Sequence, residues 1–283
     1  MKVLRTVGEL RSAMDAARNA GQTIGLVPTM GALHAGHMSL VDTARHQNDI
    51  VVASVFVNPT QFNNPNDLST YPRTEEADCA LLDEHGADYA FIPSVEEMYP
   101  EPDTRVFDLG EVAAVMEGAM RPGHFNGVAQ VVSKLFDMVR PTRAYFGEKD
   151  FQQIAVIRKM VQLEGFDLEI VACPIKREAD GLALSSRNVR LTPEGRKQAS
   201  AIHRILEQSL SLAATKSPDE LKHWVKEQID AVPGLETEYY EIADALTMQP
   251  VQNWDSPNGT VGCVTVYCGD VRLIDNILYT QPK

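Results

Sequence analysis

Two histidines stand three residues apart in a glycine-containing turn near the amino end of the chain. His34 and His37 belong to the stretch PTMGALHAGHMSL, residues 28–40, which follows the apolar run IGLV at 24–27. A strand that leads through glycines into a helix start gathers unpaired N–H groups and the positive end of the helix dipole, an arrangement that binds phosphate. A metal pair and two solvated side chains are the alternatives, and an HxxH spacing without a third ligand is weak evidence for a metal. The context therefore favours phosphate contact.

Two amide side chains follow a second apolar run. Asn58 and Gln61 lie in FVNPTQF, residues 56–62, at the carboxyl end of a predicted strand. An amide donates and accepts hydrogen bonds at once, which suits a ligand that carries hydroxyls beside a carboxylate. The residues alone favour a plainer interpretation, in which Asn58 and Pro59 end the strand and Gln61 caps a turn.

Cationic and hydroxyl side chains stand at two later points of the chain. Lys149, in YFGEKDFQQ at 145–153, is a point charge suited to phosphate and lies just before a predicted helix start. Asp150, the next residue, could contact a ribose or cap that helix. The stretch LALSSRN at 182–188 supplies two hydroxyls and one guanidinium, a set able to grip phosphates. A polar linker between domains is the alternative for that stretch, since Ser and Asn are common in loops.

The elements that must position these residues alternate between strands and helices over the first two thirds of the chain. Short β-branched or aromatic runs predict strands at 22–28, 49–59, 86–93, 143–149 and 168–175. Amphipathic patterns predict helices at 37–48, 74–86, 128–140 and 150–165. In the second helix Thr74 is the expected N-cap and Gly86 the expected C-cap. Apolar strands that alternate with helices indicate a parallel sheet covered on both faces, so we expect a Rossmann-like, doubly wound α/β domain at residues 1–175.

The pattern changes near Lys176. Helices are predicted at 193–214 and 217–232, and strands at 237–246, 260–269 and 271–279. Helices followed by antiparallel-looking strands are typical of an α+β unit. We therefore expect a smaller C-terminal α+β domain at residues 176–283, which covers the active site.

Composition limits the class of protein. With 283 residues, 44% of them hydrophobic, the chain is long enough for a large globular core. The formal net charge of -13 argues against a nucleic-acid partner, which requires clustered Lys and Arg. Charged residues interrupt the amino-terminal segment and every long apolar run, so we expect no membrane span, no signal peptide and a cytoplasmic location. The four cysteines have no metal-ligand spacing and are predicted to be buried thiols.

Six motifs stand in one order along the chain: LVPTMGALHAGH, FVNPTQF, YPRT, RPGHFNGV, FGEKDFQQ and DGLALSSRN. In order and spacing they resemble the pantoate–β-alanine ligase (pantothenate synthetase) family, and the resemblance continues to RLIDN near the carboxyl end. The histidine signature by itself marks only the wider HxGH nucleotidyltransferase superfamily. The resemblance implies that ATP and (R)-pantoate form an enzyme-bound pantoyl adenylate with release of diphosphate, and that β-alanine then displaces AMP to give pantothenate. It also implies a homodimer, and Mg²⁺ held mainly by phosphate oxygens and water.

The resemblance assigns roles by position. The catalytic residues that it implies are His34, His37 and Lys149, with His37 either a proton donor or a hydrogen-bond donor. The implied ATP-binding set is Met30, Gly31, Ala32, Leu33, His34, Ala35, Gly36, His37, Gly147, Glu148, Lys149, Asp150, Lys176, Leu184, Ser185, Ser186 and Arg187. The implied pantoate-binding residues are Asn58, Gln61 and Gln153, and Gln61 also binds β-alanine. No metal ligand is implied, although Asp78 and Glu75 are carboxylates that could lie near Mg²⁺.

Two details and two alternative functions accompany these assignments. Leu184 stands where methionine is frequent in the family, and the polar segment 63–74 is expected to act as a lid that excludes water. A cytidylyltransferase-like enzyme would use the same histidine turn but would keep a nucleotide in its product. A nucleotide-binding regulator would bind ATP without turnover. Diphosphate release that depends on pantoate, with AMP released only after the amine is added, separates the ligase from both.

Overall fold

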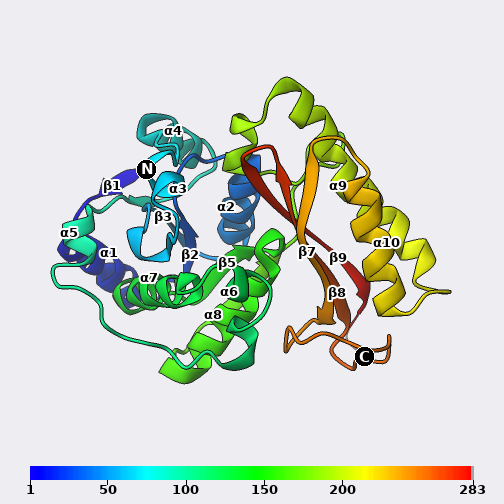
Figure 1. Ribbon diagram of the computed structural model, residues 1–283. Coiled ribbons are helices and arrows are strands. Elements are labelled where there is room, and N and C mark those ends of the chain that lie inside the picture. The colour runs from blue at the N-terminus through cyan, green and yellow to red at the C-terminus, as the bar shows by residue number, and fades with distance from the viewer. Residues whose placement is uncertain (282–283) are drawn as a thin grey trace. The chain divides into compact units, whose positions relative to one another are not determined.

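A computed structural model describes residues 1–281 of the protein (Figure 1). Its internal contacts divide the chain into two compact units. The first, the parallel-sheet unit, comprises Met1–Leu109, Met120–Glu148 and Val156–Pro174. The second, the antiparallel-sheet unit, comprises Gly110–Ala119, Lys149–Ala155 and the chain from Ile175 onward.

The parallel-sheet unit is built on six strands in the order β1-β4-β3-β2-β5-β6, in which every neighbouring pair is parallel. The strands are β1 (Lys2–Leu4), β2 (Ile24–Thr29), β3 (Ile50–Val55), β4 (Tyr89–Phe91), β5 (Arg143–Gly147) and β6 (Glu169–Cys173). β2 and β3 are almost wholly buried, because helices cover both faces of such a sheet. After β2 the chain adds β3 and then β4 on one side of it, and it then crosses over to add β5 on the other side. The topological switch point, where open α/β sheets bind ligands, therefore lies between β2 and β5.

Helices flank this sheet on both sides (Figure 1). They are α1 (Val7–Asn19), α2 (Ala35–Gln47), α3 (Pro65–Ser69), α4 (Glu75–Glu84), α5 (Val95–Met98) and α7 (His124–Val139). Two more helices, α6 (Glu117–Met120) and α8 (Phe151–Glu164), cross from one unit into the other. α2 packs against β2, β3, β5 and β6, whereas α1 and α7 pack against each other and against β2. A core that includes Val27, Val41, Val51 and Leu82 fills the space between α2, α4 and the sheet.

Helix α4 departs from its predicted capping at the first turn. Thr74 occupies the N-cap position, but its side chain makes no cap hydrogen bond. Its hydroxyl donates to the buried Asp78 carboxylate, with Oγ1 3.1 Å from Oδ1. The predicted end is confirmed, since Gly86 follows the helix with a φ of 76°, the left-handed conformation that a glycine cap supplies.

The antiparallel-sheet unit contains three strands in the order β7 (Leu235–Asp244), β8 (Thr260–Cys268) and β9 (Val271–Thr280). Helices α9 (Pro193–Leu212) and α10 (Pro218–Asp230) pack on this sheet over a continuous apolar core (Figure 1). Each helix starts at a capping hydroxyl, Thr192 or Ser217, with proline at the next position. Both features are typical helix-start chemistry, which is why sequence patterns locate these helices well.

The predicted fold class is confirmed: a doubly wound parallel sheet and a smaller antiparallel α+β unit. The sequence patterns did not predict β1 and α1, or the short helices α3 and α5. No helix among residues 1–281 combines the length and the apolar character needed to cross a bilayer. The four cysteines are all free thiols, three of them buried and Cys79 partly exposed.

Candidate active site

The histidine turn joins β2 to α2, and its two imidazoles cap the helix reciprocally. His34 is the N-cap, and its Nδ1 accepts a hydrogen bond from the Gly36 N–H at 3.1 Å. His37 Nδ1 in turn accepts from the His34 N–H at 3.3 Å, and the two ring centroids lie 4.1 Å apart. An imidazole that accepts at Nδ1 carries its proton on Nε2. In its neutral form each ring therefore carries its N–H at Nε2, beside the start of α2, where the helix dipole also favours an anion.

Asp78 of α4 fixes the backbone of this turn. Its carboxylate accepts from the Leu33 N–H at 2.7 Å and from the Ala32 N–H at 3.0 Å. Ala32 has a φ of 49°, a left-handed conformation that alanine adopts only under constraint. Asp78 is only 1% exposed, so these charge-assisted bonds are shielded from water. Asp78 is thus a positioning residue for the turn. From the sequence we expected it only as a carboxylate that could lie near Mg²⁺. Its helical spacing to the buried Leu82 is the signal that it faces inward.

The amide turn follows β3 and is organised around Asn58. Asn58 is 1% exposed, and its Nδ2 donates to Gln61 Oε1 at 3.1 Å and to the Gly127 carbonyl at 3.1 Å. Its Oδ1 accepts from the Tyr99 hydroxyl at 2.9 Å. Gln61 Nε2 lies 3.1 Å from Met30 Sδ, which belongs to the histidine turn. The structure therefore brings the predicted Gln61 next to the histidine turn, and it makes Asn58 the residue that orients Gln61.

The motif RPGHFNGV holds the amide turn in place from the start of α7. His124 is buried, and its Nδ1 lies 2.8 Å from the Gln61 carbonyl oxygen, with Nε2 3.2 Å from Arg121. A Cβ atom on Gly127 would lie 2.4 Å from the Thr60 carbonyl oxygen, so only glycine permits this close approach. His124 and Gly127 are accordingly structural supports of the Gln61 backbone.

The FGEKDFQQ motif runs from the end of β5 into α8. Lys149 and Asp150 lie in a single 3-10 turn (η3, Glu148–Asp150), and Lys149 Nζ is 3.2 Å from Asp150 Oδ2. Gln152 is buried, donates to the carbonyls of Val112 and Val115, and accepts from the Glu117 N–H. Gln153 is only partly buried and, as the next residue of a helix, points about 100° away from Gln152. The two neighbouring glutamines therefore face different surroundings.

The LALSSRN stretch is an ordered hairpin followed by a 3-10 turn. The Leu184 N–H donates to the Lys176 carbonyl at 3.0 Å, and Arg177 and Ala183 form an isolated antiparallel bridge. Ser185 then caps the turn η4 (Ser186–Arg190) by accepting from the Arg187 N–H at 3.2 Å. The contact between Leu184 and Lys176 is made by backbone atoms, so it does not require the methionine that is frequent at this position in the family.

The predicted site residues fall into two groups, one in each unit. The parallel-sheet unit contains Met30, Gly31, Ala32, Leu33, His34, Ala35, Gly36, His37, Asn58, Gln61, Gly147 and Glu148. The antiparallel-sheet unit contains Lys149, Asp150, Gln153, Lys176, Leu184, Ser185, Ser186 and Arg187. Within the first group the histidine turn and the amide turn lie together. Gly147 ends β5, the strand next to β2, and Glu148 is the residue that follows it.

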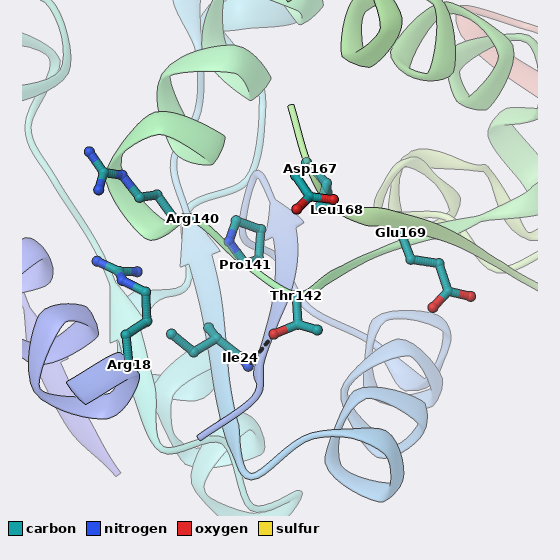
Figure 2. A pocket seen from close by; sticks show the side chains of 8 residues that line it. All are labelled: Arg18, Ile24, Arg140, Pro141, Thr142, Asp167, Leu168 and Glu169. Atoms are coloured by element: carbon teal, nitrogen blue, oxygen red, sulfur yellow. Dashed lines mark hydrogen bonds between the residues drawn. The ribbon is translucent and has the colours of Figure 1, made fainter. Parts of the chain in front are cut away.

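A separate pocket of about 570 Å³ lies at the amino ends of β2, β5 and β6 (Figure 2). The histidine turn follows the carboxyl end of β2, so the two lie at opposite ends of the strands. It is lined by Arg18, Ile24, Arg140, Pro141, Thr142, Asp167, Leu168 and Glu169. Arg18 donates to the last-turn carbonyl of Val139 in α7 and to Asp15, while Glu169 pairs with Arg143. These charges therefore secure a helix end and a strand pair, and none of the predicted site residues lines this pocket.

Comparisons with known proteins agree over the whole length of the chain. A family model described as pantoate-beta-alanine ligase matches residues 2–278. The pantothenate synthetase of Porphyromonas gingivalis W83 is 62% identical over 279 residues, 99% of this chain and 99% of that protein. The one from Bacteroides fragilis YCH46 is 59% identical over 281 residues, 99% of this chain and 100% of that protein.

Two solved structures resemble this chain closely. The crystal structure of pantothenate synthetase from Thermus thermophilus has a TM-score of 0.92 at 48% identity and covers 100% of both chains. The pantoate-beta-alanine ligase from Francisella tularensis, complexed with beta-gamma ATP and beta-alanine, has a TM-score of 0.83 at 37% identity and covers 99% of this chain and 98% of that one.

Proposed function

The chain belongs to the pantoate-beta-alanine ligase family, and from this membership we propose that it joins (R)-pantoate to β-alanine with consumption of ATP. In the first step a pantoate carboxylate oxygen attacks the α-phosphorus of ATP, and diphosphate leaves. The product is pantoyl adenylate. In the second step the β-alanine amine attacks the acyl carbon, AMP leaves with the bridging oxygen, and the nitrogen loses a proton. The final product is pantothenate, which places the enzyme in pantothenate biosynthesis.

The observation that carries this proposal is the reciprocal capping of His34 and His37. Both imidazoles use Nδ1 as an acceptor, which leaves the proton of each neutral ring on Nε2. During the attack, negative charge grows on the α-phosphate oxygens and on the departing diphosphate. Fixed N–H donors stabilise that charge without reorganising. Diphosphate is already a good leaving group, so we assign hydrogen-bond donation rather than proton transfer as the main contribution of His37.

The other ATP contacts that we propose come from short segments of both units. They are residues 30–37 and 147–150, Lys176, and residues 184–187. Lys149 supplies a point charge for phosphate, and Arg187 with its two neighbouring serines supplies a guanidinium and hydroxyls. The complex of the Francisella tularensis relative with beta-gamma ATP and beta-alanine supports nucleotide and amine binding by this fold.

Gln61 and Gln153 are the side chains that we propose for pantoate. An amide can donate to the carboxylate and accept from a hydroxyl of the same substrate. Asn58 acts on Gln61 rather than on pantoate directly, because all of its hydrogen-bonding atoms already have protein partners. We propose that Gln61 also contacts β-alanine, because the amine must approach the carbonyl carbon of the pantoyl group that Gln61 binds.

Mg²⁺ is implied by the chemistry of ATP. Among residues 1–281 no group of three His, Cys, Asp or Glu side chains is arranged to hold a metal ion. The Asp78 carboxylate is engaged by backbone N–H groups, and Glu75 pairs with Arg5 at the surface. We therefore propose that Mg²⁺ arrives with ATP, coordinated by phosphate oxygens and water, and we assign it no protein ligand. Its contribution would be to neutralise phosphate charge.

Three further proposals concern the surroundings of the reaction. The segment 63–74, which contains the short helix α3, acts as a lid that keeps water from the adenylate, because an acyl phosphate anhydride in contact with water would hydrolyse. The protein is a homodimer, which size-exclusion chromatography with light scattering tests. It acts in the cytoplasm, as a biosynthetic enzyme that uses soluble substrates.

The test of the proposed function is diphosphate release from ATP and (R)-pantoate, with and without β-alanine, and mass detection of AMP and pantothenate. We expect diphosphate to depend on pantoate, and AMP and pantothenate to appear only when the amine is present. Turnover without pantoate, or a product that keeps the nucleotide, would contradict the proposal and favour another nucleotidyltransferase. ATP binding with no turnover would favour a regulator.

His37→Ala tests the role of the histidine turn in the same assay. We expect the variant to fold and to lose at least 100-fold in adenylation rate, as loss of one donor to a developing oxyanion commonly costs on the order of 100-fold or more. His46→Ala is the matched control, because His46 lies on the exposed face of the same helix. Wild-type adenylation by His37→Ala would contradict the proposed phosphate contact.

A further inference from the structure

A buried polar pair lies in the middle of the last strand, in the RLIDN segment. Asp275 is 5% exposed and Asn276 is 7% exposed, although β9 is otherwise a mainly apolar strand. Burying a carboxylate and an amide is unfavourable unless both are hydrogen-bonded. Successive residues of a strand point to opposite faces, so the pair reaches two different segments of the antiparallel-sheet unit.

Asp275 holds the base of the hairpin that leads to Ser185. Its two carboxylate oxygens accept from the Arg177 guanidinium at 2.7 and 2.9 Å, a bidentate pair with a fixed geometry. The same guanidinium donates to the Gly181 carbonyl at 3.1 Å, and Arg177 is bridged to Ala183 across the hairpin. Asp275 thus fixes both arms of the hairpin a few residues before Ser185.

The hairpin is also held from the α9 side. His203 Nδ1 lies 4.0 Å from Asp275 Oδ2, and a Cβ atom on Gly181 would lie 2.6 Å from His203 Cδ2. Gly181 has a φ of 91°, which excludes other residues at the turn. The turn therefore packs closely against the His203 imidazole of α9.

Asn276 holds a different segment of the same unit. Its Nδ2 donates to the Lys149 carbonyl oxygen at 3.1 Å, a contact between residues 127 positions apart in the chain. A lysine side chain has four flexible carbons, so the place of its ammonium depends on how firmly its backbone is fixed. The bond from Asn276 anchors that backbone at the 3-10 turn that precedes α8.

We propose that Asp275 and Asn276, which are neighbours on β9, are both positioning residues. Asp275 sets the placement of Arg187 and its two neighbouring serines, and Asn276 sets the placement of Lys149. The inference rests on the proposed function, in which both segments contact ATP phosphates. It assigns the pair to nucleotide binding and adenylation, whereas pantoate recognition does not depend on it.

Asn276→Asp is the sharpest test, because it keeps the size and shape of the side chain and removes the donor to the Lys149 carbonyl. We expect the KM for ATP to rise at least fivefold, with the KM for pantoate within twofold of wild type. Asn253→Asp makes the same chemical change on an exposed residue of the same unit and should match wild type. An unchanged KM for ATP in Asn276→Asp would overturn the inference, as would an equal rise of both KM values.

Hydrogen exchange on the protein without substrate gives a readout that does not need activity. We expect faster amide exchange at residues 147–152 in Asn276→Asp and at 177–188 in Asp275→Asn, with the sheet amides of β7 and β8 unchanged. Should Asp275→Asn not fold, Asn276→Asp decides the question. Unchanged exchange in the segment that each variant contacts would overturn the inference. Absence of pantoate-dependent turnover in the wild-type protein would instead refute the proposed function, and exchange would still decide whether the pair holds these segments.

Discussion

Replacing Asp78 with asparagine should slow adenylation strongly, because the histidine turn depends on both carboxylate oxygens. In the native turn one oxygen accepts from the Ala32 N–H and the other from the Leu33 N–H. An asparagine side chain has one acceptor oxygen, so one of these two N–H groups loses its partner in a site that is closed to water. Ala32 can then leave the left-handed conformation that it adopts in the native turn.

The magnitude follows from the strength of the lost contact. A hydrogen bond to a charged acceptor contributes about 1.5 to 3 kcal/mol, and a buried donor without a partner carries a penalty of similar size. If this free energy is required to restore the native conformation of the turn before each adenylation, the rate constant decreases about 10- to 100-fold, at about 1.4 kcal/mol for each factor of ten. Adenylation depends on that conformation because His34 and His37 begin the helix that follows the turn.

The assay is single-turnover formation of pantoyl adenylate with saturating ATP and (R)-pantoate, together with thermal unfolding. Glu76→Gln is the control, since Glu76 is an exposed carboxylate in the first turn of the same helix. We expect adenylation by Asp78→Asn to be about 10- to 100-fold slower than wild type, and the control to equal wild type. Adenylation by Asp78→Asn at the wild-type rate would refute the positioning role.

The remaining predictions concern recognition, acid stability and thiol reactivity. Gln61→Ala should raise the KM for pantoate about tenfold or more, the equivalent of about 1.4 kcal/mol, and leave the KM for ATP nearly unchanged in initial-rate measurements; an unchanged pantoate KM would remove Gln61 from the pocket. Burial raises the pKa of Asp244, but hydrogen bonds led by those from Ser256 and Thr247 outweigh it and lower the pKa from 3.8 to about 2. Asp244→Asn should therefore lower the free energy of unfolding by about 2 kcal/mol at pH 7, and the denaturant curves of the two proteins should converge as the pH falls from about 4 to 2; a difference that persists at pH 2 would contradict this cause. Burial raises the pKa of the Cys263 thiol to about 12, so alkylation at pH 8 followed by mass spectrometry should find Cys79 modified long before Cys263.

The parallel sheet could be predicted because its strands are continuous apolar runs between amphipathic helices. That pattern arises when both faces of a sheet are covered, and it marked β2, β3 and β5 without any knowledge of their partners. β1 spans only three residues and owes its existence to pairing with β4, far along the chain. A periodicity cannot be measured over so short a segment, so no local pattern indicated this edge strand.

The candidate site was predictable where the chemistry is local. The spacing of His34 and His37 indicated that the two imidazoles would lie together at a helix start, and the ring centroids are 4.1 Å apart. Contacts between distant residues left no such pattern. Asp78 lies 46 positions from the Ala32 N–H that it holds, and Asn276 lies 127 positions from Lys149. Each is a polar residue on a buried face, which signals an unknown partner but does not identify it.

The most direct test of the proposed reaction follows oxygen from pantoate. (R)-Pantoate labelled with ¹⁸O in its carboxylate should be incubated with the enzyme, ATP, Mg²⁺ and β-alanine in unlabelled water, and the AMP and diphosphate analysed by mass spectrometry. If the carboxylate attacks the α-phosphorus, the bridging oxygen stays with AMP, which should carry one ¹⁸O atom per molecule while diphosphate carries none. AMP without the label, or label in diphosphate or phosphate, would contradict a pantoyl adenylate and with it the role given to the histidine turn.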